Sequence, residues 1–265
     1  MIIGGLQKNT LIDFPGKLAC IVFLAGCNFR CPWCYSAELV LPEKIAKQPR
    51  ILEKEIFEFL ETRKGLLEGV VLCGGEPTIN KDLPEFIKKI KKMGFAVKLD
   101  TNGSNPKMLK DLIDAKLIDY VAMDIKTSRK SNFQFSIFNF QSNSNDQISK
   151  HKSAYESLFI DGVDMKDIEE SVRILKLGLV DFEFRTTVVP DVHTKEDFLA
   201  IAKWIGDKDV RYYLQNFRAE KTIDPNFSAQ GGPASGGEKA KAYPQSFLEE
   251  VAKEISSHFK ECKAR

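Results

Sequence analysis

The stretch Gly26-Cys27-Asn28-Phe29-Arg30-Cys31-Pro32-Trp33-Cys34-Tyr35 places three cysteines within eight residues. It follows directly on Ala19–Leu24, an apolar run with a β-branched centre that predicts a strand. Thiolates this close together on one loop can surround a single soft metal centre. The whole chain has 6 cysteines in 265 residues, which is too few for a disulfide scaffold. The crowding therefore indicates metal or redox chemistry rather than structural bridges.

Spacing alone leaves three interpretations of this cysteine loop open. Iron–sulfur cubanes normally take four cysteines, and no fourth cysteine is near in sequence, so one iron of a [4Fe-4S] cluster would stay open to a ligand. A zinc site would need His151, His193 or a distant cysteine as its fourth ligand. Cys31 and Cys34 alone form a C-x-x-C pair that would suit a redox dithiol.

Strand-like and helix-like segments alternate along the chain. Six apolar runs predict strands: Ala19–Leu24, Val70–Cys73, Ala96–Leu99, Tyr120–Met123, Phe182–Val189 and Val210–Leu214. Amphipathic helices are predicted between them, with Asn105 and Thr194 as two of the N-caps. This alternation predicts an α/β protein, a partial, open (β/α)6 TIM-like barrel with parallel strands. Its working face would lie at the C-terminal ends of the strands.

The pattern divides the chain into a core and a tail. Residues 1–217 form the predicted core domain, interrupted at 129–165 by a segment rich in Ser, Asn, Gln and Phe. A connection of that length predicts a lid or a partner-docking insertion. Residues 218–243, which contain Gly-Gly-Pro-Ala-Ser-Gly-Gly, predict a flexible linker. Residues 244–265 are predicted as a C-terminal helix on the spacing of apolar residues at 247, 251 and 255.

The cysteine spacing resembles a known family signature. C-x3-C-x2-C with an aromatic residue before the last cysteine, on the loop after the first predicted strand, is similar to the signature of the radical S-adenosylmethionine (radical SAM) superfamily. Gly74-Gly75-Glu76-Pro77 closes the second predicted strand, as the GGE motif of that superfamily does. The likeness is close over residues 1–128 and moderate over 181–217. The implied function is a radical SAM enzyme.

Within the superfamily, the chain resembles the glycyl-radical-enzyme activases, and among them the activating protein of the anaerobic ribonucleoside-triphosphate reductase. Five segments carry this likeness: Gly5-Leu6-Gln7, Leu11-Ile12-Asp13-Phe14-Pro15-Gly16, Leu99-Asp100-Thr101-Asn102-Gly103, Met123-Asp124-Ile125-Lys126 and Phe184-Arg185-Thr186-Thr187-Val188-Val189-Pro190. Activases commonly carry His-Asn after the third cysteine, where this chain has Tyr35-Ser36. The resemblance implies reductive cleavage of SAM to a 5′-deoxyadenosyl radical, which generates a glycyl radical on a partner enzyme.

The resemblance also implies a set of site residues, in the cysteine loop and on the predicted strands or at their ends. Cys27, Cys31 and Cys34 would hold the [4Fe-4S] cluster, with the fourth iron open to SAM. The implied SAM-binding residues are Trp33, Tyr35, Gly74, Gly75, Glu76, Thr101, Lys126, Arg185 and Gln215. Asp100, Thr101 and Asp124 would hold a monovalent cation, or else act as polar caps of their strands. Buried charges are costly unless paired, so Lys126 and Arg185 are expected either on the SAM carboxylate or in a structural salt bridge.

The expected partners are a glycyl radical enzyme and an electron donor such as flavodoxin or ferredoxin. No nucleic acid is expected, because the net charge is only +2. No apolar run reaches the ~18 residues of a membrane span, and the first residues lack a signal-peptide pattern. We therefore expect no membrane association and a cytoplasmic location. Two other functions stay open: a radical SAM enzyme acting on a small molecule or RNA, similar to deazaguanine synthases, and a non-catalytic zinc or iron–sulfur binding module.

Overall fold

A computed structural model describes residues 1–129, 158–160, 162–190, 192–218, 220–224 and 242–265. These residues contain one eight-stranded sheet, formed by β1 (Ile3–Thr10), β2 (Ala19–Leu24), β3 (Gly69–Gly74), β4 (Ala96–Thr101), β5 (Tyr120–Asp124), β6 (Asp181–Val188), β7 (Asp207–Asn216) and β8 (Phe259–Ala264). The helices are α1 (Ala37–Val40), α2 (Pro42–Ile45), α3 (Glu53–Glu61), α4 (Leu83–Lys92), α5 (Pro106–Asp114), α6 (Met165–Leu175), α7 (Lys195–Ile205) and α8 (Gln245–Ile255). Short 3-10 turns lie at Pro77–Ile79 and Ser256–His258.

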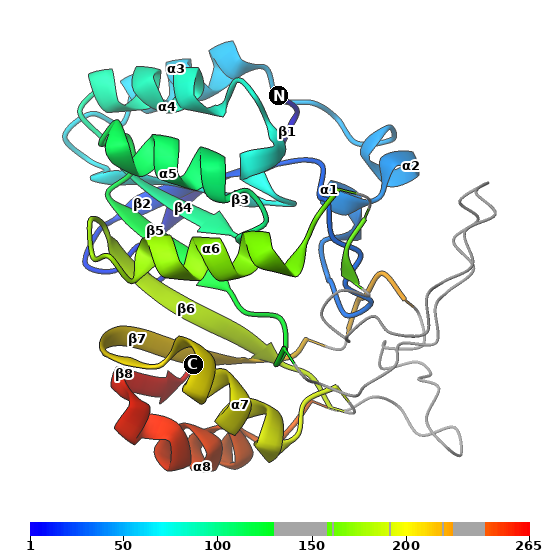
Figure 1. Cartoon of the computed structure of the whole chain (residues 1–265). Helices are drawn as coiled ribbons and strands as arrows, with labels where there is room; N and C mark the ends of the chain where they lie inside the picture. The colour runs from blue at the N-terminus through cyan, green and yellow to red at the C-terminus, as the bar shows by residue number, and fades with distance from the viewer. Residues whose placement is uncertain (130–157, 161, 191, 219, 225–241) are drawn as a thin grey trace.

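The sheet is an open, curved α/β layer. Its strands lie in sequence order from β1 to β8; β1 runs antiparallel to β2, and all other neighbours are parallel. The edge strands β1 and β8 do not pair with each other, so the barrel does not close. Helices α3 to α6 follow one another along one face of the sheet, and α1 and α2 lie beyond its C-terminal edge (Figure 1). This arrangement confirms the predicted α/β partial barrel.

The predicted elements of the core are all present. Each of the six predicted strands coincides with one of β2 to β7. The side chain of Asn105 accepts a hydrogen bond from the Met108 N–H and caps α5. Thr194 caps α7 in a capping box with Asp197. Both caps satisfy backbone donors that the first helical turn leaves without an internal partner.

Two strands at the edges differ from the prediction. β1 was not predicted because Gly4 and Gly5 and its polar second half hide the strand pattern. The tail predicted as a helix over 244–265 is wrong in its second half, because α8 ends at Ile255 and β8 follows. The charged residues of β8 are typical of an edge strand, where they discourage pairing with other chains. They also make the segment too polar to be recognised as a strand.

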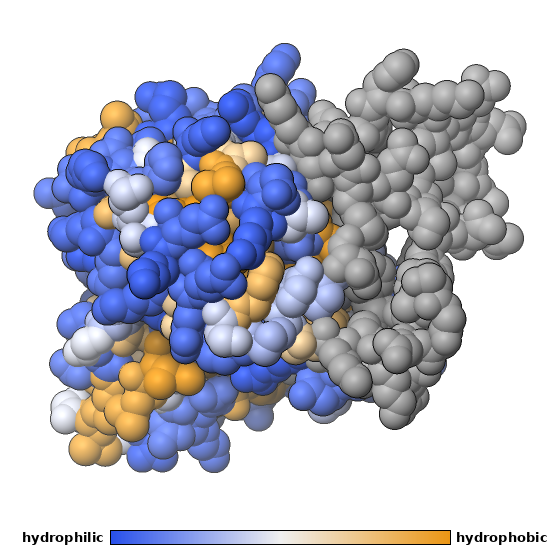
Figure 2. Space-filling model, turned by 90° about the horizontal axis from the view of Figure 1, so that it is seen from below, coloured by the Kyte–Doolittle hydropathy of each residue, from blue (hydrophilic) through white to orange (hydrophobic). Residues whose placement is uncertain are grey.

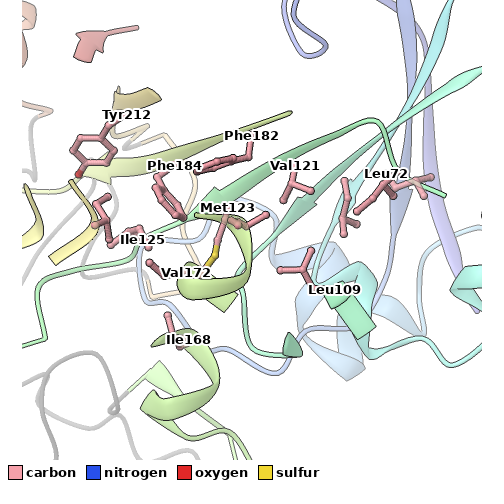
Figure 3. Close-up of a cluster of buried hydrophobic side chains, with 14 of the residues drawn as sticks. Leu72, Leu109, Val121, Met123, Ile125, Ile168, Val172, Phe182, Phe184 and Tyr212 are labelled. Carbon is pink, nitrogen blue, oxygen red and sulfur yellow. The ribbon is translucent and has the colours of Figure 1, made fainter. Parts of the chain in front are cut away.

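The two faces of the sheet carry different residues. Val121 and Met123 of β5 point into the main apolar core between the sheet and helices α5 and α6 (Figure 3). Tyr120 packs instead in a second cluster with Phe14 and Ile21, on the inner face of the barrel. Successive residues of a strand point to opposite faces. The inner face therefore also receives Asp124, and the charged residues described below lie on it.

Most of the predicted insertion 129–165 and linker 218–243 lies outside the described residues. The described parts 158–160 and 220–224 contact the cysteine loop, as shown below. The face drawn in Figure 2 consists mostly of hydrophilic residues with smaller hydrophobic areas between them. Among the described helices, none has both the length and the apolar character that a membrane span requires.

Candidate functional site

The cysteine loop, residues 25–36, leaves the C-terminal end of β2. Cys31 is buried, and Cys27 and Cys34 are half-buried. Burial raises the pKa of all three thiols, that of Cys27 to about 11. Lys126 opposes this increase at each of them, so it is the cation that stabilises negative charge on the loop. The other two thiols contribute to the raised pKa of Cys31 through charge repulsion.

Two segments that are distant in sequence form hydrogen bonds with the backbone of this loop. On one side, Arg30 N–H donates to the Leu158 carbonyl at 2.9 Å and Ile160 N–H donates to the Asn28 carbonyl at 3.0 Å. The rings of Phe29 and Phe159 pack between these bonds with centroids 5.0 Å apart. The segment 158–160 thus adds a short antiparallel pairing to the first half of the cysteine loop.

A second segment pairs with the other half of the loop. Ile223 N–H donates to the Cys34 carbonyl at 2.9 Å, and Asp224 N–H donates to the Pro32 carbonyl at 3.0 Å. Lys221 also forms an ion pair with Glu38 in α1. Residues 220–224, at the start of the predicted linker, are therefore part of the folded site.

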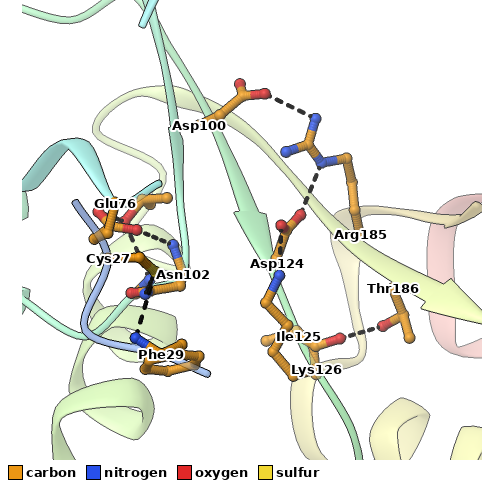
Figure 4. Close-up of polar contacts among 12 residues, drawn as sticks. Cys27, Phe29, Glu76, Asp100, Asn102, Asp124, Ile125, Lys126, Arg185 and Thr186 are labelled. Carbon is orange, nitrogen blue, oxygen red and sulfur yellow. Dashed lines mark hydrogen bonds and ion pairs between the residues drawn. The ribbon is translucent and has the colours of Figure 1, made fainter. Parts of the chain in front are cut away.

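Glu76 organises the strand ends beside the loop. Its carboxylate is 1% exposed and accepts from Thr78 N–H at 3.0 Å, the Thr78 hydroxyl at 2.6 Å, the Thr101 hydroxyl at 2.7 Å and Asn102 N–H at 2.6 Å. Burial raises the pKa of Glu76, while these donors oppose the increase. The side chain of Asn102 in turn lies against Cys27 (Figure 4). Glu76 therefore ties the end of β3 to the end of β4 next to the cysteine loop.

The Gly74-Gly75 pair is explained by close backbone packing. A Cβ on Gly74 would lie 2.2 Å from the Leu24 carbonyl oxygen, and Gly74 has a φ of +127°. A Cβ on Gly75 would lie 1.9 Å from the Gly26 carbonyl oxygen. Gly75 N–H and Glu76 N–H donate to these same two carbonyls at 2.8 Å. The glycines thus bring the end of β3 into direct contact with the start of the cysteine loop.

Four charged residues form a chain across the inner face of β4, β5 and β6 and the loop beyond β5 (Figure 4). Arg185 donates from Nη1 to Asp100 and from Nε to Asp124, both at 3.1 Å. Lys126 donates to the second oxygen of Asp124 at 2.9 Å. Burial alone would raise the pKa of Asp124, but Lys126 and Arg185 hold it at about 2. Burial alone would lower the pKa of Arg185, but the two aspartates raise it well above its ordinary value.

Lys98, which the sequence analysis did not single out, completes this network. It is 1% exposed and forms an ion pair with Asp100. The sequence indicates this pair through the alternation of charged and apolar residues in Lys98-Leu99-Asp100, because residues two apart on a strand lie on the same face. Lys98, Arg185 and Lys126 thus share the carboxylates of Asp100 and Asp124.

The residues expected to hold a monovalent cation have other partners. Asp100 and Asp124 are both paired with Arg185, and the Thr101 hydroxyl donates to Glu76. A cation at these oxygens would have to displace Arg185 or Lys126. The cation site therefore stays a prediction from the resemblance.

The remaining predicted site residues are spread around the mouth of the barrel. Trp33 is buried in the main core, 6.3 Å from the His193 ring. Tyr35 is 57% exposed, with the Arg218 guanidinium 5.8 Å from its ring centre. Gln215 lies near the C-terminal end of β7, in register with Thr187 of β6. The structure thus brings the predicted charged residues and the Gly74-Gly75 pair together near the cysteine loop, whereas Trp33 is a core residue.

The donor set of the cysteine loop fits an iron–sulfur cluster better than a zinc ion. His193 Nδ1 accepts from Val189 N–H at 3.0 Å and Nε2 faces the Lys126 carbonyl at 2.8 Å, so both ring nitrogens are in use. His151 lies outside the described residues. In the described part of the chain, no three His, Cys, Asp or Glu side chains are gathered around the position of a single ion. A cubane distributes its thiolates over separate irons, so it does not need that convergence.

Comparison with known proteins agrees with this geometry. Residues 21–205 match the Radical SAM superfamily. The chain belongs to the radical SAM superfamily. It is 33% identical to MJ1227 of Methanocaldococcus jannaschii, which is named as a candidate glycyl-radical enzyme activating enzyme. The match extends over 228 residues and covers 85% of this chain and 84% of MJ1227. A second such protein of that organism, MJ1632, is 26% identical over 83% of this chain and 77% of its own length.

Solved structures support the radical SAM fold. Streptococcus suis SuiB bound to S-adenosylmethionine superimposes with a TM-score of 0.57 at 14% identity, over 92% of this chain and 51% of SuiB. The chain thus spans about half of the SuiB chain. The enzyme anSMEcpe with bound AdoMet gives a TM-score of 0.53 at 16% identity, over 91% of this chain and 62% of that one. As a member of the radical SAM superfamily, this chain is an oxidoreductase whose cofactors are a [4Fe-4S] cluster and S-adenosylmethionine.

Proposed function

We propose that this radical SAM enzyme is an activase that generates a glycyl radical on a partner enzyme, with an anaerobic ribonucleoside-triphosphate reductase as the first candidate. The observation that carries the proposal is the 33% identity to a named activating enzyme over 85% of this chain. A match of that length covers most of both proteins. The choice of reductase rests on the five sequence segments that resemble its activating protein.

In this proposal Cys27, Cys31 and Cys34 hold the cluster at the C-terminal edge of the sheet. When bound and reduced, the cluster supplies the electron that cleaves SAM to methionine and a 5′-deoxyadenosyl radical, which takes a hydrogen atom from the substrate glycine. Lys126 stabilises the three thiolates. The segments 158–160 and 220–224 hold the loop that carries these cysteines through backbone hydrogen bonds.

The charge network supports a place for the SAM carboxylate. Lys98, Arg185 and Lys126 gather positive charge at this place, and positive charge favours binding of an anionic group. Lys126 donates to Asp124 and lies at the edge nearest the cysteines, so it is the cation best placed to contact that carboxylate as well. The residues at the ends of β3 and β4, from Gly74 to Glu76 and at Thr101, would line the rest of the SAM site, with Tyr35 and Gln215 at its rim.

The open barrel supports a macromolecular substrate. Its edge strands do not close, so a loop of a partner protein can approach the C-terminal ends of the strands. A one-electron donor such as flavodoxin or ferredoxin would reduce the cluster, and we place the reaction in the cytoplasm.

The first experiment is anaerobic cluster reconstitution, reduction with dithionite in the presence of SAM, and assay of 5′-deoxyadenosine. Cys31→Ala should abolish the product, whereas Cys262→Ala, a thiol of β8 outside the cysteine loop, should retain it. Adding the candidate reductase should then produce a glycyl radical signal by electron paramagnetic resonance (EPR). Product without any radical on the reductase would exclude that partner. Zinc without iron or sulfide would instead support a non-catalytic metal-binding module.

A second candidate is chemistry on a small molecule. The 7-carboxy-7-deazaguanine synthase of Thermococcus kodakarensis is 28% identical over 128 residues, which is 42% of this chain and 50% of that one. The shorter overlap makes this alternative weaker than the activase. Formation of 7-carboxy-7-deazaguanine by the reconstituted enzyme, without a partner protein, would establish it.

A further inference from the structure

The sulfur of Cys27 has two nitrogen donors beside it. Phe29 N–H donates to Cys27 Sγ at 3.3 Å, within the loop itself. The side-chain amide nitrogen of Asn102 approaches the same sulfur at 4.0 Å from the end of β4 (Figure 4). Asn102 therefore links the sulfur to a different strand of the sheet.

The amide of Asn102 is held in one orientation. Its Oδ1 accepts from Ser104 N–H at 2.9 Å, and its Nδ2 donates to Asn28 Oδ1 at 3.0 Å. A rotation of the amide by 180° would place the NH2 group against the Ser104 N–H, where two donors would face each other. The NH2 group therefore stays directed at the cysteine loop. Asn28 is fixed in turn, because its Nδ2 donates to Ser104 Oγ at 2.8 Å.

The backbone beneath Asn102 is anchored from several sides. Asn102 N–H donates to Glu76 at 2.6 Å, and the Ser171 hydroxyl of α6 donates to the Gly103 carbonyl at 2.6 Å. Gly103 has a φ of +77°, and a Cβ there would lie 2.1 Å from the Met123 side chain. These contacts fix the turn at the end of β4, so the position of the Asn102 amide does not depend on the cysteine loop alone.

A donor at this place acts on the cluster's charge. Hydrogen bonds to cysteine sulfurs are among the factors that set the reduction potential of an iron–sulfur cluster. Reduction adds negative charge that the sulfurs share, so a donor stabilises the reduced cluster more than the oxidised one. Asn102 is only 5% exposed, so water screens this effect little.

We propose that Asn102 is a positioning residue that holds the Cys27 thiolate and raises the reduction potential of the cluster. This inference rests on the proposed ligation of the cluster by Cys27. Asn102, at the end of β4, would thereby favour reduction of the cluster, the step that precedes SAM cleavage. The electron for this step would come from a donor of the flavodoxin or ferredoxin class, or from dithionite in the assay.

The test is an EPR-monitored redox titration of the reconstituted full-length chain without SAM. Asn102→Leu keeps the size of the side chain and removes the donor. We expect the ratio of reduced to oxidised cluster at a fixed solution potential to fall about tenfold, equivalent to about 59 mV for one electron. The matched control is Asn105→Ser, which keeps a capping oxygen for α5 three residues along the same turn and should leave the potential unchanged.

Iron and sulfide content are measured in every sample. An unchanged potential in Asn102→Leu with a complete cluster would overturn the inference alone. If that variant takes up no cluster, Asn102→Ser is titrated instead, since its hydroxyl can still accept from Ser104 N–H but is too short to reach Cys27, and the same decrease is expected. A wild-type chain that binds zinc and no cluster would overturn the proposed function together with this inference.

Discussion

The charged side chains of the inner face are paired both within a strand and between neighbouring strands. Lys98 and Asp100 lie two residues apart on β4, and Arg185 reaches from β6 to Asp100 and to Asp124 of β5. An unpaired charge in this interior would be costly. The pairing therefore explains how a barrel interior can carry ions instead of the packed aliphatic layers of a closed barrel.

His193 is the residue whose protonation should be visible in stability. It bridges Val189 N–H and the Lys126 carbonyl, and burial lowers its pKa from 6.5. Below pH 6.5 the unfolded chain gains a proton at this residue that the folded chain does not take up. The free energy of unfolding should therefore decrease as pH falls from 6.5 toward the lower folded-state pKa, with a slope of at most about 1.4 kcal/mol per pH unit.

Urea unfolding of the reconstituted protein between pH 7.5 and 5 measures this slope. The control is His193→Gln, whose amide can occupy both hydrogen bonds but does not titrate. The variant should show a flatter pH dependence than the wild type in that interval. The two proteins differ at residue 193 alone, so the difference between their slopes reports on His193. Equal slopes would show that His193 does not change its protonation differently in the two states.

The cysteine loop is stabilised as an element by segments that follow it by more than 120 residues. Phe159→Ala removes the ring that packs on Phe29 while the backbone hydrogen bonds of Leu158 and Ile160 stay possible. We expect a decrease of about 1 to 2 kcal/mol in the free energy of unfolding, from the lost aromatic pair and apolar area. The looser loop should also release iron to a chelator several-fold faster.

Phe57→Ala provides the matched control. Phe57 is also half-buried, and its ring pairs with Phe86 at 5.3 Å, between α3 and α4 on the helical side of the sheet. It should reduce the unfolding free energy by a similar amount and leave the rate of iron release unchanged. Iron release that depends only on global stability, and is therefore equal in both variants, would contradict a specific role for the segment 158–160.

The elements of the core were predictable from sequence because each depends on local periodicity. The residues Leu83, Phe86, Ile87 and Ile90, spaced at i, i+3, i+4 and i+7 in the sequence, form the buried face of α4. The edges were not predictable, since β1 contains a glycine pair and β8 is short and charged. The cysteine loop was found from its spacing, but the partners of Arg185 were not, because they depend on strand register and on which strands become neighbours. The contacts of 158–160 and 222–224 arise only from the folded chain.

On the scale of the whole molecule, the sheet separates a helix-covered side from an inner side that ends at the cysteine loop. The cysteines, the Gly74-Gly75 turn and Lys126 all lie at the C-terminal ends of parallel strands, where successive strand ends converge. The insertion begins after β5 at this same edge and returns to it through 158–160. A connection of this length at a working edge is usually functional. A docking role for it is thus the prediction that depends on the architecture as a whole.

Replacing residues 130–157 with a Gly-Ser linker of the same length tests this role. The cysteines, Lys126 and the segment 158–160 remain, so we expect 5′-deoxyadenosine formation with dithionite to stay near the wild-type rate. Glycyl radical formation at a subsaturating concentration of the partner should fall about tenfold, as for a loss of about 1.4 kcal/mol of binding. Saturating partner should restore most of the yield, since docking and not chemistry is weakened. Wild-type activation at low partner concentration would exclude docking through these residues, and a parallel loss of SAM cleavage would show that they support the cofactor site instead.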